Sequence, residues 1–478
     1  MKTMMKMFDA ISPLDYRYYG GDQRIFEKLS PYVSEAANIR YQLKVEAAIV
    51  KALAKEKICS ESVAKEIQHA CETVTPEEIH EEEERIQHNI RALVNCVARK
   101  VSDKARPYVH LFATSADIMD TATALRLKEL TRDVLLPDLI ELELQLINMA
   151  RENAETIQIG RTHGKHAEPI TFGFALALYV DRLGNRIQHI AAAGSNLRGQ
   201  FSGAVGAYNA LALVFPKDPA GFEQVVLREL GLKPSDGGIS TQIVEPEYVT
   251  DLVYTSISCF SVLANLADDI RHLHRTEIGE VQERYEEENV GSSTMPHKIN
   301  PKYFENVKSL WKAIMPRMIT VFMDQISEHQ RDLTNSASSR FVPEVFAALV
   351  YAANRLKDSL GRIQIDRQRM LENLSMSKGS IIAEPLYILL ALNGVPDAYA
   401  YTRKLVARSS SSRRPLNEII WEDERAAPIL RGLQEKQRKI FQDPSLYIGA
   451  APQRTHVVCD YWEPIVDTLK TQLREHLY

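Results

Sequence analysis

Apolar residues recur at spacings of three and four along most of the chain, which is the period of an amphipathic α-helix. From about residue 117 to residue 361 the repeats persist beyond the length of an ordinary helix. Alternation typical of strands is scarce, so the pattern predicts an all-α protein. Helices this long need several neighbours to bury their apolar faces, and we expect an extended central bundle that pairs with copies of itself. The predicted long helices carry Leu135, Leu139, Leu142, Leu146 and Met149; Leu176, Tyr179, Leu183, Ile187 and Ile190; Val253, Ile257, Phe260, Leu263, Ala267 and Ile270; Phe304, Val307, Leu310, Ile314, Met318 and Val321; and Val345, Ala348, Ala352, Leu356 and Leu360.

The pattern divides the chain into three helical domains. The first opens with a Pro-containing turn at residues 12–18, followed by one helix near residues 22–54. Further on, a helix is predicted to continue through His88, and a lone helical histidine is more often structural than catalytic. The last domain is smaller, more charged, and contains a basic, Ser-rich loop at residues 408–414. The three domains span residues 1–111, 112–364 and 365–478.

Breaks rich in glycine or proline interrupt the long helices. At residues 160–169, two glycines and a proline predict a loop. His163 and His166 lie three residues apart there, but no cysteine or regular helix sets the geometry that a metal site requires. The break at residues 194–209 is rich in glycine but follows no strand, so a dinucleotide-binding turn is not indicated.

Composition and charge disfavour several classes of function. The chain has 478 residues and a formal net charge of −5, so we expect neither nucleic-acid nor membrane binding, and an anionic substrate would be held by local Arg and Lys. The five cysteines include no C-x-x-C pair, which indicates reduced thiols rather than a disulfide framework or a zinc site. The N-terminus lacks the apolar segment of a secretory signal, and no apolar run approaches the ~20 residues that span a bilayer. We therefore expect a cytoplasmic protein.

Two polar segments carry chemistry suited to anions. Thr114 and Ser115, with Asp117 in the first turn, predict a helix start, whose free backbone N–H groups bind anions well. A plain N-cap explains the same residues. Further along, Arg331 and Arg340 flank hydroxyls and an amide, a set that suits a phosphate. A solvated loop with salt bridges explains that segment equally well.

The segment at residues 291–301 has the most unusual composition for a link between helices. One glycine and two prolines exclude regular helix, and polar residues crowd between them. Loops with this chemistry usually carry function, although a linker with a serine cap is the alternative. The order Gly-Ser-Ser-x-Met-Pro-x-Lys-x-Asn-Pro resembles the signature of the fumarase/aspartase superfamily at all eight fixed positions. The resemblance implies the superfamily's helical fold and elimination of fumarate from a succinyl-substituted amine or alcohol.

Within that superfamily the chain is most similar to the adenylosuccinate lyase family, from Ser12 to about Arg408. The pair Arg17 and Tyr18, together with the later Arg-Ser-Arg set, points to a nucleotide phosphate. Where many family members have Asp after the histidine of the second motif, this chain has Asn89, which forms hydrogen bonds but carries no charge. The matching segments begin at Ser12, His88, Thr114, Gly160, Thr241 and Arg331.

The resemblance implies a role for each matching residue. Ser292 is the general base that removes a C–H proton, and His163 is the general acid that protonates the leaving nitrogen. Lys298 stabilises the serine alkoxide and the dianionic intermediate, and His88 has a supporting catalytic role. Asn300 holds a substrate carboxylate. The other residues expected to bind substrate are Arg17, Tyr18, Asn89, Thr114, Ser115, Thr162, Gln242, Arg331, Ser336 and Arg340.

The resemblance also implies an assembly and a substrate. Family members are homotetramers whose active sites take loops from three subunits, and no metal or organic cofactor is implied. The implied substrates are adenylosuccinate, cleaved to AMP and fumarate, and the succinyl-carboxamide imidazole nucleotide SAICAR, cleaved to AICAR. One alternative is another lyase or cycloisomerase of the superfamily, similar to 3-carboxymuconate cycloisomerase or argininosuccinate lyase. Another is a non-catalytic scaffold of the same fold, which the presence of Ser292, Lys298 and His163 argues against.

We expect Ser292→Ala to lose turnover by more than about 100-fold while it still binds substrate, because the base is gone but the phosphate and carboxylate contacts remain. Steady-state rates and a binding titration with the nucleotide check the two halves separately. Near-normal turnover would return the role of base to a histidine.

Overall fold

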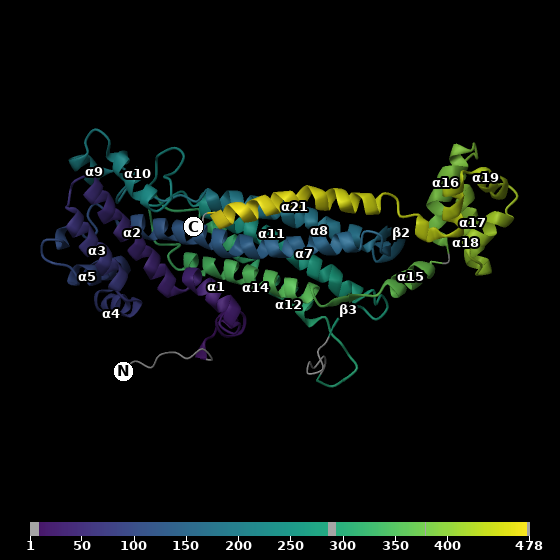
Figure 1. Cartoon of the computed structure of the whole chain (residues 1–478), viewed down its shortest axis with the longest axis horizontal. Helices are drawn as coiled ribbons and strands as arrows, with labels where there is room; N and C mark the ends of the chain where they lie inside the picture. Colours follow the sequence, from purple (N-terminus) through teal and green to yellow (C-terminus); the bar gives the residue numbers. More distant parts are fainter. Residues whose placement is uncertain (1–8, 285–292, 378, 476–478) are drawn as a thin grey trace.

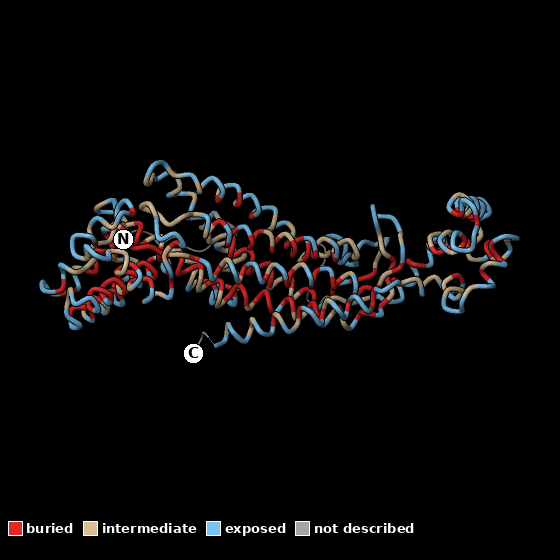
Figure 2. Tube along the Cα trace, turned by 90° about the horizontal axis from the view of Figure 1, so that it is seen from above, coloured by how far each residue is buried: buried red, intermediate tan, exposed pale blue. Residues whose placement is uncertain are grey.

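The computed structural model, which describes residues 9–284, 293–377 and 379–475, is a long rod of helices with a smaller helical unit at each end (Figure 1). The predicted all-α class and central bundle of long helices are confirmed. Buried residues lie along the middle of the rod and exposed residues on its outside (Figure 2). The rod contains α6 (Ser115–Leu130), the π-helical turn η4 (Thr131–Leu135), α7 (Leu136–Glu152), α8 (Phe172–Ser195), α11 (Glu247–Leu273), α12 (Lys302–Ile314), α13 (Arg317–Met323), α14 (Val342–Leu360) and α21 (Ala451–Glu475).

One large apolar core runs through this rod. Each long helix turns a stripe of apolar residues inward, at the spacing that the sequence predicts. On α7, Leu139, Leu142 and Leu146 are fully buried, and Leu183 and Ile187 of α8 lie in the same core. Each such side chain removed from water stabilises the fold by about 1.5–3 kcal/mol. The relative positions of the long helices are therefore fixed by many apolar contacts at once.

Two side-chain caps divide the N-terminal unit differently from the prediction. The single helix expected near residues 22–54 is two helices, because the Ser34 hydroxyl accepts a hydrogen bond from a backbone N–H at 3.1 Å and starts the second one. The helix expected to continue through His88 is also broken. Gln87 adopts a left-handed φ of 60°, and His88 Nδ1 accepts a hydrogen bond from the Arg91 N–H at 3.2 Å, so His88 is an N-cap. The helices are α1 (Gln23–Val33), α2 (Glu35–Lys55), α3 (Glu61–Thr73), α4 (Pro76–Ile86) and α5 (Asn89–Arg99).

The C-terminal unit has an apolar core of its own, around Leu386, Leu390 and Phe441. The basic loop expected at residues 408–414 is wrong for most of its length, because α17 continues to Ser412 and its end is marked by a left-handed residue, Arg413. The unit contains α15 (Arg367–Ser375), α16 (Ala383–Leu392), α17 (Ala398–Ser412), α18 (Leu416–Glu422), α19 (Ala426–Gly432) and α20 (Glu435–Gln442).

The last helix, α21, leaves the C-terminal unit and packs along α7 and α8 of the rod (Figure 1). Trp462 is buried there, and its Nε1 donates a hydrogen bond to Asp181 at 2.9 Å. A Cβ added at Gly184 would lie 2.5 Å from the Trp462 ring, so a glycine is required for this close approach. The exact limits of the three predicted domains stay a prediction, although residues 451–475 share the core of the central one.

The first break in the long helices is a β-hairpin, so the loop expected at residues 160–169 is wrong. Strand β1 (Ile157–Thr162) pairs antiparallel with β2 (Lys165–Thr171). The two-residue turn consists of His163 and Gly164, with φ of 53° and 71°, and two left-handed residues match the twist of a hairpin.

A second small sheet joins two segments far apart in the chain, because β3 (Val281–Glu283) pairs antiparallel with β4 (Ile363–Ile365). The helix expected to run from Phe304 to Val321 is interrupted at Pro316, which separates α12 from α13. The break after α8 is irregular up to the short helix α9 (Asn209–Val214), which α10 (Pro219–Glu229) follows.

Helix α11 contains a longer apolar stretch than the other long helices of the rod that the structure describes. Among the described residues it is the one helix long and apolar enough to cross a membrane by length and composition. Its most apolar window is 67% buried inside the rod, where a core helix of a soluble protein passes the same test. Its apolarity is therefore explained by its central place in the bundle.

Candidate functional site

The predicted site residues fall into three groups along the rod, and Ser292 lies outside the described residues. The first, the α6 group, gathers around the start of α6. The second, the hairpin group, lies at the turn between β1 and β2. The third, the α12 group, lies beside α12. Since α5 and β2 lie at opposite ends of the central bundle (Figure 1), the α6 group and the hairpin group of one chain are far apart. The members are His88, Asn89, Thr114, Ser115, Gln242 and Arg331 in the α6 group; Thr162 and His163 in the hairpin group; and Arg17, Tyr18, Lys298 and Asn300 in the α12 group.

A buried carboxylate fixes the start of α6. Helix α6 begins at Ser115 with Thr114 as its N-cap, where the sequence predicts a helix start. Asp117 is fully buried, and its Oδ2 accepts a hydrogen bond from the Thr114 N–H at 2.9 Å. Its Oδ1 accepts from the backbone N–H groups of Ser202 and Gly203 at 3.1 and 3.3 Å. Burial raises the pKa of Asp117 to about 7, against these three hydrogen bonds, which favour the charged form.

Contacts across four segments bring the rest of the α6 group together. The Asn89 amide contacts the sulfur of Met119 on α6 at 3.6 Å. Asp120, the next residue of the same helix, accepts a hydrogen bond from the Val244 N–H at 3.1 Å. Burial raises the pKa of Asp120 to about 6, against the nearby positive charge of Arg331. The chain at Arg331 is in turn joined to residue 242, because the Gln242 N–H donates to the residue 330 carbonyl at 3.4 Å.

Ser336 and Arg340 follow Arg331 in the turn that precedes α14, and both side chains are exposed. The turn is closed by Ser338, whose hydroxyl donates to Asp324 at 2.6 Å. Arg340 itself lies in a short 3₁₀ turn, Ser338–Phe341. The two residues are therefore displayed at the surface next to the α6 group and are not built into the core.

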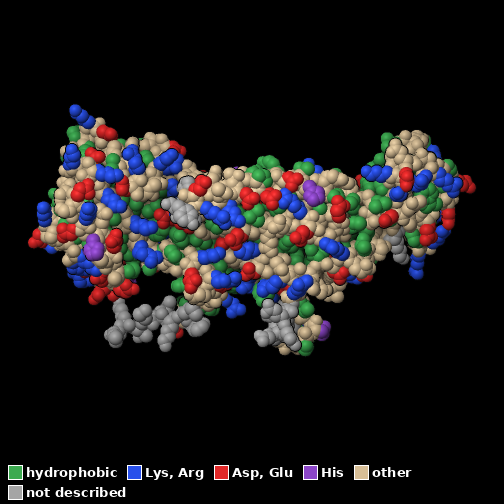
Figure 3. Space-filling view, viewed as in Figure 1, with side chains coloured by type: hydrophobic (Ala, Val, Ile, Leu, Met, Phe, Trp, Pro, Cys, Tyr) green, Lys and Arg blue, Asp and Glu red, His purple; other side chains and the backbone are tan. Residues whose placement is uncertain are grey.

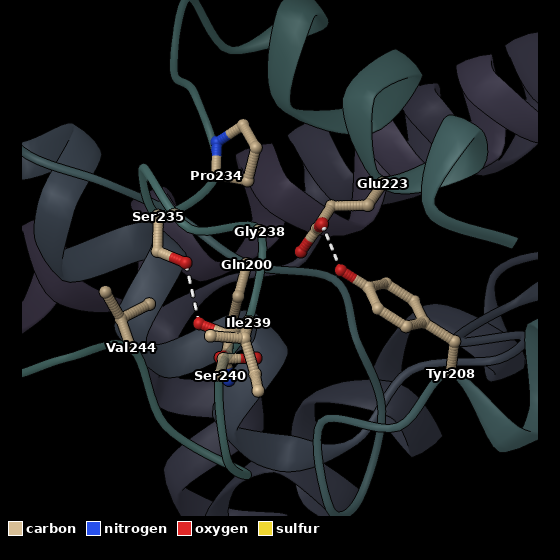
Figure 4. Close-up of a pocket in the computed structure, with 10 residues that line it drawn as sticks. Gln200, Tyr208, Glu223, Pro234, Ser235, Gly238, Ile239, Ser240 and Val244 are labelled. Atoms are coloured by element: carbon tan, nitrogen blue, oxygen red, sulfur yellow. Dashed lines mark hydrogen bonds between the residues drawn. The ribbon is translucent and has the colours of Figure 1, made fainter.

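A small pocket near the α6 group is lined by polar groups that form hydrogen bonds within the protein (Figure 4). The Tyr208 hydroxyl donates to Glu223 at 2.7 Å, and the Phe201 N–H donates to the other oxygen of the same carboxylate at 2.8 Å. The Gln200 side-chain amide donates to the Gln242 carbonyl. Because these polar groups already have hydrogen-bond partners, we interpret the residues around this pocket as structural support for the site.

The hairpin group is exposed at the tip of its turn. Thr162 and His163 are both exposed. On the next strand, His166 Nδ1 lies 3.0 Å from the Ser377 hydroxyl, which links the hairpin to the end of α15. Partial burial and the charge of Arg161 lower the pKa of His166. His163 is thus exposed at the turn of a hairpin whose second strand contacts another part of the chain.

The α12 group lies on the side of the rod near α14. The rings of Tyr18 and Tyr351 meet edge to face, with centroids 5.1 Å apart, and the Asn306 amide of α12 lies 3.5 Å from the Tyr18 hydroxyl. Arg17 is exposed next to this pair. Lys298 is also exposed, in a turn closed by its N–H and the carbonyl of residue 295 at 3.0 Å.

Sequence reasoning assigned no role to His110, which the structure adds to the α6 group. His110 Nδ1 lies 2.6 Å from Glu46 Oε1, and the two side chains are 18% and 2% exposed. Burial lowers the pKa of His110, but the charge and hydrogen bond of Glu46 outweigh it, so the pKa is raised. The signal in the sequence was a histidine four residues before Thr114. Its partner lies 64 residues away and leaves no local pattern.

Comparison with known proteins identifies the family. Residues 16–315 match the family model described as lyase, and residues 327–437 match the one described as adenylosuccinate lyase C-terminal. The chain belongs to the adenylosuccinate lyase family. This family member is 34% identical to adenylosuccinate lyase of Pyrococcus abyssi over 461 residues, which cover 95% of the chain and 98% of the relative. It is 30% identical to adenylosuccinate lyase of Bacillus subtilis over 351 residues, covering 73% and 79%. The family resemblance read from the motifs is therefore confirmed, and the chain is a lyase.

Solved structures show the same architecture over nearly the whole chain. A fumarate lyase from Mesorhizobium sp. BNC1 superimposes with a TM-score of 0.79 at 25% identity, covering 91% of this chain and 97% of that one. A 3-carboxy-cis,cis-muconate lactonizing enzyme from Pseudomonas putida gives a TM-score of 0.80 at 24% identity, covering 95% and 99%. The second likeness shows the fold alone, which this lactonizing enzyme shares with the chain.

We expect Glu46→Gln to lower the pKa of His110, because it removes the charge that holds the proton there. The pair stabilises the wild type fully below the unfolded pKa of about 6.5, and this contribution disappears as pH rises through the higher folded-state pKa. An NMR titration of the histidine ring protons and urea unfolding at several pH values measure both effects. Glu72→Gln, at an exposed His–Glu pair, is the matched control and leaves the His110 titration unchanged. An unaltered His110 titration in Glu46→Gln would contradict the assignment.

Proposed function

We propose that the chain cleaves adenylosuccinate to AMP and fumarate, and SAICAR to AICAR and fumarate, by β-elimination. The observation that carries the proposal is family membership over 95% of the chain, together with the residues that this chemistry needs. An elimination of this kind requires a base, an acid and positive charge near a carboxylate, which Ser292, His163 and Lys298 supply.

The reaction is a proton abstraction followed by loss of the amine. Ser292 takes the proton from the carbon next to the one that bears the departing nitrogen. The electron pair spreads into the adjacent carboxylate. Lys298 stabilises that doubly charged intermediate, because fixed charge in a site that excludes water is worth more than in solution. The C–N bond then breaks, and His163 gives a proton to the leaving nitrogen. The products are fumarate and the free amine of the nucleotide.

The substrate has two charged parts, the succinyl carboxylates and the phosphate, and a different set of residues binds each part. Hydroxyl and amide donors, which add no charge, suit the carboxylates of the succinyl part. Arginines suit the phosphate, because a guanidinium grips it with two parallel hydrogen bonds. His88 has a supporting role at the succinyl or the phosphate end, and Gln242 and Asn89 also bind the substrate. The carboxylate set is Thr114, Ser115, Thr162 and Asn300, and the phosphate set is Arg17, Tyr18, Arg331, Ser336 and Arg340.

The working enzyme is proposed to be a cytoplasmic homotetramer with each active site built from three subunits. Support comes from the separation of the α6 group and the hairpin group along one chain, which prevents these two groups from meeting around one small molecule. Further support comes from apolar side chains on outward faces, since Leu178 of α8, Tyr254 of α11, and Ile319 and Met323 of α13 are each more than half exposed. On the face in Figure 3, Lys and Arg side chains are interspersed with Asp and Glu, which favours a small-molecule partner over nucleic acid or membrane.

The function is tested by mixing the purified protein with adenylosuccinate, following ultraviolet absorbance, and identifying the products by chromatography. We expect AMP and fumarate in equal amounts. If a folded oligomer leaves adenylosuccinate unchanged but converts another succinyl amine or carboxymuconate, the proposed substrate is wrong. The proposed elimination chemistry would then still hold.

The shared site is tested by mixing two inactive variants, His163→Gln and Ser292→Ala, after reversible dissociation. If the two residues come from different subunits, random assortment restores both at about a quarter of the sites, with that share of wild-type activity. The matched control mixes Ser292→Ala with Lys298→Gln, which lie in one segment of one chain and restore nothing. No recovery in the first mixture would contradict a site divided between the hairpin and the signature segment.

A further inference from the structure

Another fully buried carboxylate, Glu280, lies against strand β1 of the hairpin that carries His163. It accepts hydrogen bonds from three side chains on two elements. Arg161 donates through Nη2 at 2.6 Å and Nη1 at 3.2 Å, and Gln158 donates at 2.7 Å, both from β1. Asn373 of α15 donates at 2.8 Å. Both carboxylate oxygens are therefore engaged, as a buried carboxylate requires.

The backbone of Glu280 connects the same place to two further segments. Its N–H donates to the Leu273 carbonyl at the end of α11, at 3.0 Å. Its carbonyl accepts from the Asp366 N–H, between β4 and α15, at 2.9 Å. One residue thus joins the long helix α11, the second small sheet, α15 and the hairpin. A displacement of β1 away from α11 or α15 would therefore break contacts that meet at Glu280.

Arg161 connects this junction to the proposed catalytic residue. It comes directly before Thr162 and His163 in the chain, and its side chain is only 16% exposed. Its guanidinium also donates to the Ile159 carbonyl at 3.3 Å, which fixes its direction within β1. His163 is exposed at the turn. Its position therefore depends on strand β1, which leads to it.

We propose that Glu280 is a positioning residue: through Arg161 it fixes the hairpin so that Thr162 and His163 reach the substrate in the correct place. The proposal rests on the proposed function for the role of His163. It predicts loss of rate rather than loss of binding, because a displacement of about 1 Å of a catalytic group can cost 100-fold in rate. The phosphate contacts, which lie in the other two groups, are untouched.

Glu82 offers a matched control, because it has the same chemistry elsewhere. It is 5% exposed and accepts hydrogen bonds from Arg85 at 2.7 Å, Asn95 at 2.7 Å and Arg99 at 2.9 Å, all within the N-terminal unit. Glu82→Gln therefore breaks a buried carboxylate network of two arginines and an amide without touching the hairpin. A merely structural role for Glu280 would make the two variants behave alike.

The test compares Glu280→Gln, Arg161→Gln, their double variant and Glu82→Gln. With adenylosuccinate, we expect Glu280→Gln to lower kcat about 100-fold while KM changes less than about fivefold. The double variant is expected to lose no more than about twofold beyond the worse single one, because the two residues act as a unit. Glu82→Gln is expected to melt at a lower temperature and keep kcat within about twofold of wild type.

Hydrogen exchange of residues 157–171 supplies a readout that does not depend on the reaction. We expect these amides to exchange faster in Glu280→Gln and unchanged in Glu82→Gln. A kcat within twofold of wild type in folded Glu280→Gln, multiplicative losses in the double variant, or an equal loss in Glu82→Gln would each overturn the proposal. If Glu280→Gln does not fold, Arg161→Lys, which keeps the charge with fewer donors, takes its place with the same expected direction.

The two failures are distinguishable. If the wild-type protein releases no fumarate from adenylosuccinate, the proposed function fails. Exchange of the hairpin amides then tests by itself whether Glu280 fixes the hairpin. Faster exchange in Glu280→Gln then supports it, and unchanged exchange overturns it.

Discussion

The apolar contact among the long helices is the constraint on which the rest of the structure depends. Helix α11 alone has 27 residues, which at 1.5 Å per residue makes it about 40 Å long. Helices packed side by side over such a length form a rigid rod. Groups at its two ends are held apart by the same contacts that stabilise the fold. A rod of this kind holds residues in fixed places but cannot close groups at its two ends around one substrate, which is the reason for proposing that its copies share sites.

Polar breaks in the rod are held to it by buried carboxylates. Asp117 holds the start of α6 and the break at residues 202–203, whereas Glu280 holds the hairpin. Their surroundings differ in charge. Asp117 accepts from backbone N–H groups, and its pKa is raised to about 7, while Glu280 has the guanidinium of Arg161 beside it. A carboxylate buried in a helical bundle is costly unless donors surround it, so each position requires its partners to stay in place. Irregular backbone thereby gains a fixed position relative to regular helices.

The sequence predicted what depends on local pattern. Helical periodicity gave the long helices of the rod, and the residues Thr114, Ser115 and Asp117 gave the start of α6. Local pattern failed where one residue decides between two structures. The Ser34 cap divides a helix that its apolar residues would continue, and the left-handed turn at His163 makes strands of a segment that glycine and proline suggested was a loop.

The candidate site was predictable in its chemistry but not in its arrangement. The motifs supplied the residue types, and the family they indicated is the family found. The pairs of side chains that orient those residues could not be predicted from the sequence. Glu46 lies 64 residues from His110 and Glu280 lies 119 from Arg161, and such partners are brought together only by the packing of the whole rod. Arg161 was visible in its motif, but its role depends on a carboxylate from another element.

The central claim is that one substrate is held by residues of three chains. A structure of the Ser292→Ala variant with adenylosuccinate bound tests it most directly. The account predicts one nucleotide contacted by Thr114, His163 and Lys298 from three different subunits. A nucleotide contacted by all three residues of the same chain, or bound away from them, would contradict it.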